Sequence, residues 1–200
     1  MILHSRLTAR TGPAPDEVPR LIAEVGALTA RARAAFGGLS ASQLNWKPAP
    51  TEWSIAQCLE HLLLINADYF PILERVARGA WTPSVKERLP LLPRLFGKMV
   101  LALVQPGSTR KVQAVARFRP STSAIPGDIV ARFAAHQDTL AWHMDAAGRR
   151  DLARTIITSP VSSVVTYSLL DAYRIIVAHE GQHMAQAERV LGNVRKSALT

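Results

Sequence analysis

Apolar residues recur at three- and four-residue steps in four long stretches of the chain, which is the period of an amphipathic α-helix. We predict helices over residues 16–36, 54–78, 128–147 and 166–191. Thr166 is a suitable N-cap for the last helix, and Gly192–Asn193 is a stop signal after it. Pro71 lies inside the second stretch and predicts a kink or a break there. No segment shows the alternation of a β-strand, so the pattern predicts an all-α four-helix bundle.

The segments outside this pattern define the domain organisation. Residues 1–15 contain Gly12, Pro13 and Pro15, and we expect them to form a flexible N-terminal arm. Residues 16–192 are expected to form a single helical domain, followed by a C-terminal tail over 193–200. The long connection over 79–127 is rich in proline, and a helix is expected within it at about 91–104. A structureless connection of this length is unusual, so the segment should carry structure or function.

Composition narrows the class of protein. The chain has 200 residues and one cysteine, Cys58, so an intrachain disulfide is impossible, which favours a reducing, cytoplasmic location. It has no apolar run of about 18 residues, so no membrane span is expected, and no apolar stretch of a secretory signal follows its N-terminus. The net charge is +9, but the basic residues are scattered and only 6% of residues are aromatic. Specific nucleic-acid binding is therefore not expected.

The pattern His179-Glu180-x-x-His183 lies on the fourth predicted helix. A spacing of four places both imidazoles on one helix face, where they can share a divalent metal ion if another element adds a ligand. The same pattern is the H-E-x-x-H motif of zinc proteases. A protease is the weaker interpretation, because no further histidine ligand follows His183 and no substrate-binding strands are predicted.

The residues alone leave the third ligand open. His61 lies on the apolar side of the second helix, whereas His136 and His143 share a face of the third helix. His4, in the N-terminal arm, is the poorest choice. Cys58 lies one turn before His61 and is either a fourth ligand or, more commonly for a lone buried cysteine, a small core residue.

Several strings of the chain occur in a fixed order: Trp46-x-Pro48, Trp53-Ser54-Ile55-x-Gln57-x-Leu59-x-His61-Leu62, Arg117-Phe118-x-Pro120 and His179-x-x-x-His183-x-x-Gln186. Together they resemble the DinB/YfiT-like superfamily. The resemblance implies a four-helix bundle of up-down-down-up topology with a long connection between the second and third helices. It also implies a divalent metal ion, zinc or nickel, held by His61, His179 and His183.

The resemblance further implies a metal-dependent transferase or hydrolase that acts on a small molecule, with a low-molecular-weight thiol or water as nucleophile. The alternative is a non-catalytic, stress-associated protein whose metal is structural or vestigial. Glu180 is the candidate catalytic base by analogy with H-E-x-x-H sites, and its alternative is a carboxylate that pairs between helices. Family members are often homodimers, and the apolar residues of 91–104 support a dimer here. The same segment either binds a membrane surface or, as we favour, covers the bundle.

Overall fold

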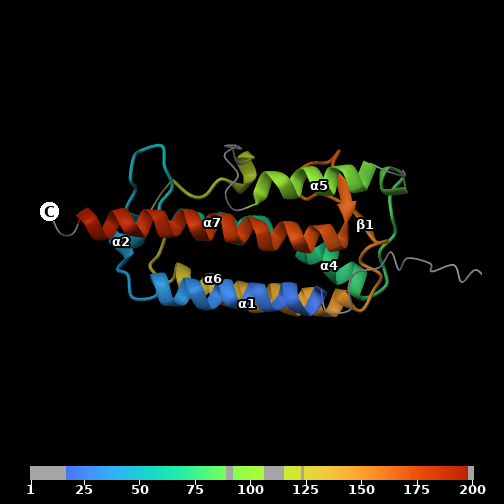
Figure 1. Ribbon diagram of the computed structural model, residues 1–200, viewed down its shortest axis with the longest axis horizontal. Coiled ribbons are helices and arrows are strands. Elements are labelled where there is room, and N and C mark those ends of the chain that lie inside the picture. The colour runs from blue at the N-terminus through green and yellow to red at the C-terminus, as the bar shows by residue number, and fades with distance from the viewer. Residues whose placement is uncertain (1–16, 89–91, 106–114, 123, 198–200) are drawn as a thin grey trace, which may run out of the picture.

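The computed structural model describes residues 17–88, 92–105, 115–122 and 124–197, so the expected N-terminal arm lies outside the described residues. Four helices form the bundle in the described part of the chain: α1 (Glu17–Phe36), α3 (Ile55–Ala67), α6 (Ile129–Gly148) and α7 (Leu169–Ser197). Helices α1 and α3 each pack against both α6 and α7. Figure 1 shows α7 running along the molecule, with α1 on one side of it and α5 (Leu92–Val104) on the other. The prediction of an all-α helical bundle is confirmed.

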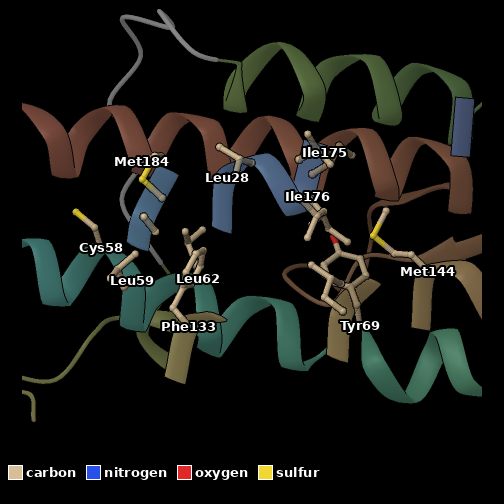
Figure 2. Packing of buried hydrophobic residues seen from close by; sticks show 14 of the residues in the cluster. Leu28, Cys58, Leu59, Leu62, Tyr69, Phe133, Met144, Ile175, Ile176 and Met184 are labelled. Carbon is tan, nitrogen blue, oxygen red and sulfur yellow. The ribbon is translucent and has the colours of Figure 1, made fainter. Parts of the chain in front are cut away.

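The core lies where these helices meet. Figure 2 shows Leu59 and Leu62 of α3 beside Phe133 of α6, and all three side chains are fully buried. Burial of each such side chain contributes about 1.5–3 kcal/mol to the free energy of folding. The buried side chains are mostly apolar, but the buried set also includes His61, Asn66, Gln137 and Glu180.

The second predicted helix is divided in two, as Pro71 indicated. Helix α3 ends at Ala67, and α4 (Phe70–Ala77) begins with Pro71 in its first turn. A proline there costs no hydrogen bond, because the first N–H groups of a helix have no partner within the helix. The buried Tyr69 between the two helices forms a hydroxyl–hydroxyl hydrogen bond of 2.7 Å with Tyr167.

The boundaries predicted for the last helix are wrong. Helix α7 begins at Leu169, not at Thr166, and it continues through Gly192 to Ser197. An interior glycine costs a helix about 1 kcal/mol. Residues Leu191 and Val194, on either side of Gly192, are both buried, so their packing offsets that cost.

A short antiparallel hairpin precedes α7 and was not predicted. Strand β1 (Ile156–Thr158) pairs with β2 (Thr166–Ser168), and Ile157 lies opposite Tyr167. Three residues per strand are too few for an alternating pattern to be recognised. Thr166, expected as a helix cap, is instead the first residue of β2.

The long connection contains the expected helix, α5 (Leu92–Val104), which packs against α7 and β2. Its outer side chains Leu95 and Met99 are 64% and 46% exposed. The homodimer expected from this segment stays a prediction. Short elements complete the described chain: α2 (Ala41–Asn45), η1 (Lys86–Arg88) and η2 (Ala116–Phe118). Across the residues that the structure describes, no helix is both long and apolar enough to span a membrane.

The contact between α5 and α7 requires a glycine. A Cβ atom at Gly97 would lie 2.7 Å from Asp171 Oδ2 and 3.2 Å from Asp171 Cβ, so the carboxylate cannot simply rotate away. Gly97→Ala is therefore expected to lower the free energy of unfolding by about 1–3 kcal/mol. The matched control is Gly26→Ala in α1, because a Cβ there meets no atom within 4 Å. Gly26→Ala should raise the free energy of unfolding by about 0.5–1 kcal/mol. Urea denaturation that changes the free energy of unfolding in the same direction for both variants would contradict the close contact at Gly97.

Candidate metal centre

A capping box at the start of α3 sets the position of His61. Ser54 Oγ accepts a hydrogen bond of 3.1 Å from the Gln57 N–H, and Gln57 Oε1 accepts one of 3.1 Å from the Ser54 N–H. This reciprocal cap satisfies two N–H groups at the helix terminus and fixes where α3 begins. His61 then lies about two turns into the helix, and its side chain is directed into the bundle with only 4% exposed.

Three imidazoles from α3 and α7 come together. The Nε2 atom of His179 lies 3.4 Å from His61 Nε2 and 3.1 Å from His183 Nε2. One ligand atom from each histidine lies within 4.8 Å of the others. His179 and His183 are one turn apart on α7, as their spacing predicted, and His61 comes from the facing helix α3.

Of the other residues considered as ligands, His136, His143 and Cys58 lie elsewhere, and His4 lies outside the described residues. His136 and His143 on α6 stack against Phe70, with ring centroids 4.9 Å and 4.8 Å away. Neither belongs to the group of clustered ligand atoms, and neither does Cys58. The Cys58 side chain is fully buried, and desolvation raises the pKa of its thiol to about 12. Cys58 therefore has the surroundings of a core residue.

Outer hydrogen bonds fix the tautomers of two of the three histidines. His61 Nδ1 lies 2.6 Å from the carbonyl oxygen of Phe118, and His183 Nδ1 lies 3.0 Å from Gln186 Oε1. Both oxygens can only accept, so each Nδ1 carries the hydrogen. In a neutral ring this leaves an Nε2 lone pair directed at the centre of the cluster, which is the form that binds a metal.

Burial keeps these rings uncharged. Desolvation lowers the pKa of His61, His179 and His183, and that of His183 falls to about 3. Charge on a neighbouring imidazole lowers the pKa of His179 and His183 further. Neutral imidazoles are the state that a divalent cation requires of its ligands.

Two of the three spacings within the histidine cluster match those around a metal ion. Two nitrogen ligands at about 2.0–2.1 Å in tetrahedral geometry lie about 3.3 Å from each other. The two Nε2–Nε2 distances of 3.4 Å and 3.1 Å are close to that value. The three side chains are therefore compatible with one divalent ion.

Comparison with known proteins identifies the family. The family model described as the DinB superfamily matches residues 25–187, which is most of the chain. The chain belongs to the DinB superfamily. The match covers all three histidines: it includes the whole of α3 and extends into α7 as far as residue 187. Searches of curated proteins and of solved structures give no match.

In this DinB superfamily chain an aromatic ring forms one wall of the histidine cluster. The indole of Trp53 stacks on His183, with centroids 5.6 Å apart and planes inclined by 21°. Its centroid is also 4.9 Å from that of His61. Trp53, the first residue of the family-like string that contains His61, therefore packs on two of the three histidine rings.

Glu180 is directed into the core of the DinB bundle. Its side chain is fully buried, and Oε1 accepts a hydrogen bond of 2.6 Å from Asn66 Nδ2. Desolvation raises the pKa of this carboxyl to about 7, although the Gln137 and Asn66 amides nearby oppose the shift. Among the described residues, Glu180 Oε2 and both side-chain polar atoms of Gln137 have no partner in hydrogen-bonding geometry. Within the described ranges, the Glu180 carboxylate therefore lies against the amides of Asn66 and Gln137 and pairs with no arginine.

Proposed function

We propose that this DinB superfamily protein binds one divalent metal ion, zinc or nickel, through His61, His179 and His183, and that it is a metal-dependent enzyme. The observation that carries the proposal is the convergence of three Nε2 atoms with no fourth histidine, cysteine or carboxylate ligand in the group, over the residues described. Metal sites with three protein ligands usually keep one position for water or substrate and are catalytic, whereas structural sites usually have four protein ligands.

The proposed reaction is a transfer or hydrolysis on a small molecule, with a low-molecular-weight thiol or water as nucleophile. Three neutral ligands leave the charge of a bound divalent ion uncompensated, and such an ion lowers the pKa of water or thiol at its open position. The protein itself orients the ligands through Phe118 O and Gln186 Oε1. Trp53 covers the cluster on the side of His183 and limits the approach of water there.

The protease interpretation has less support. In an H-E-x-x-H protease the glutamate acts as a base beside the metal. Here Glu180 Oε1 accepts a hydrogen bond from Asn66, in the same buried region as Gln137. The role of Glu180 as a base stays a prediction. It depends on Oε2, because Oε1 already accepts the hydrogen bond from Asn66. The non-catalytic alternative differs from the proposal only in whether an exogenous ligand reaches the metal.

The proposal is tested on protein purified without a histidine tag. Elemental analysis is expected to find about one zinc or nickel ion per chain. After replacement by Co²⁺, the visible spectrum should indicate three nitrogen ligands, and an added small thiol should produce a sulfur-to-cobalt charge-transfer band. Bound metal whose spectrum does not respond to thiol, azide or cyanide would favour the structural alternative. A chain that binds neither zinc, nickel nor cobalt would refute the site itself.

A further inference from the structure

Residues 115–122, here called the strap, lie across α3 and are held by three of its side chains. Gln57 Nε2 donates to Ser121 O over 2.8 Å, and Glu60 Oε2 accepts from the Ser121 N–H over 2.6 Å. His61, one turn after Gln57 and directly after Glu60, donates from Nδ1 to Phe118 O over 2.6 Å. The carbonyl that orients a metal-binding imidazole therefore belongs to a segment outside the four long helices.

Arg117 attaches this strap to two further elements. Its guanidinium pairs with the carboxylate of Asp68, which caps the C-terminal end of α3. The same Nη2 atom donates to Pro160 O, over 2.7 Å, in the loop between β1 and β2. The guanidinium also lies 4.4 Å above the centroid of the Phe118 ring, which is itself buried. Arg117 thus ties the strap to the C-terminal end of α3 and to the β1–β2 loop.

We propose that Arg117 is a positioning residue for the metal centre, and this inference rests on the proposed function. By holding the strap between α3 and the β1–β2 loop, Arg117 keeps Phe118 O within hydrogen-bonding distance of His61 Nδ1. A neutral imidazole has two tautomers, and only the one with hydrogen on Nδ1 directs a lone pair from Nε2 towards His179. Loss of an outer partner of a metal-binding histidine typically costs 10- to 100-fold in metal affinity.

The competing view is that Arg117 forms an ordinary surface ion pair. The Arg117 side chain is 56% exposed and that of Asp68 is 37% exposed, and such pairs usually contribute little to stability. A surface pair would have no effect on the tautomer of a buried histidine. The state of the His61 ring therefore distinguishes the two views, and it can be measured without any metal.

The first measurement uses the full-length, metal-free protein. The ¹⁵N chemical shifts of His61, assigned with a His61→Gln variant, should show hydrogen on Nδ1 and a free Nε2 in the wild type. In Arg117→Ala, both shifts should move towards the average of the two tautomers. Arg117→Lys should recover part of the wild-type pattern, because an ammonium can keep the pair with Asp68. Arg78→Ala is the matched control, since Arg78 pairs with Glu74 on α4 and is 65% exposed.

The second measurement is the affinity for Zn²⁺, by competition with a chromophoric chelator. Arg117→Ala is expected to bind 10- to 100-fold more weakly, and Arg78→Ala as the wild type does. If Arg117→Ala does not fold, Asp68→Asn removes the charge of the same anchor and is expected to change the tautomer in the same direction. Unchanged His61 shifts and unchanged Zn²⁺ affinity in a folded variant would overturn the role of Arg117. If the wild type binds no metal but the His61 shifts still respond to Arg117→Ala, the proposed function is refuted. The role of Arg117 in holding Phe118 O against His61 would then stand.

Discussion

Replacing His179 with alanine is expected to abolish tight metal binding. Its Nε2 atom is the one placed close to both of the others, at 3.4 Å from His61 and 3.1 Å from His183. Without it the two remaining imidazoles come from different helices, and two ligands do not complete the usual set of three or four. We expect the Zn²⁺ affinity of His179→Ala to fall by at least 100-fold.

The loss is measured by chelator competition and by the thermal shift on adding Zn²⁺. A ligand at 1,000 times its dissociation constant stabilises the folded state by about 4 kcal/mol, so the wild-type shift should be large. His179→Ala should show little or none of it at the same Zn²⁺ concentration. His143→Ala is the control, because His143 lies on α6, where its ring stacks on Phe70 and meets Trp142 edge-on, outside the cluster. Equal Zn²⁺ shifts in the wild type and His179→Ala would show that the metal binds elsewhere.

The long helices were predictable because each buries one continuous face over many turns. The period of α6 indicated residues 128–147, and the structure has Ile129–Gly148. Local signals failed where tertiary packing outweighs them. Gly192 stays helical because Leu191 and Val194 are buried, and Thr166 joins β2 because Ile156–Thr158 lies beside it. The local sequence does not show the packing that buries α7 around Gly192, nor the pairing of β1 with β2.

At the candidate site, too, some features could be read from the sequence and others are decided only by the fold. The spacing of His179 and His183 follows from helix geometry alone, so it could be read from the sequence. His61 was selected by family resemblance, since His136 and His143 were equally possible from the residues. The carbonyl of Phe118 could not be found at all, because every residue carries a carbonyl group and only the fold decides which one faces His61.

Glu180→Gln is expected to stabilise the protein, relative to the wild type, more at pH 8 than at pH 5. The buried carboxyl has a pKa of about 7, raised by desolvation from an ordinary value of 4.5. Below pH 4.5 the group is neutral in both the folded and the unfolded chain. As the pH rises, the unfolded chain releases this proton first, so the stabilisation declines and is fully lost above pH 7. The loss is up to about 3 kcal/mol for a shift of this size.

The amide of Glu180→Gln does not titrate, and its oxygen can still accept the hydrogen bond from Asn66. Buried histidines have the opposite effect: the pKa of His136 is lowered to about 4 and that of His183 to about 3, so they favour folding as the pH rises towards 6.5. The histidines are common to both proteins and largely cancel in the difference. Urea denaturation in EDTA at pH 5, 6, 7 and 8 should therefore show the stability of the variant, relative to the wild type, increasing steadily.

Glu74→Gln on the exposed part of α4 is the control for removing one glutamate. Parallel pH profiles for Glu180→Gln and the wild type would mean that Glu180 is paired with a positive charge in solution. The same variant also tests the chemistry. If Glu180 acts only on the core, Glu180→Gln should bind Zn²⁺ with wild-type affinity, because neither carboxylate oxygen belongs to the ligand cluster. If Glu180 is a base at the metal, the variant should bind metal normally but lose turnover. Both roles therefore predict unchanged metal binding, and only turnover distinguishes them.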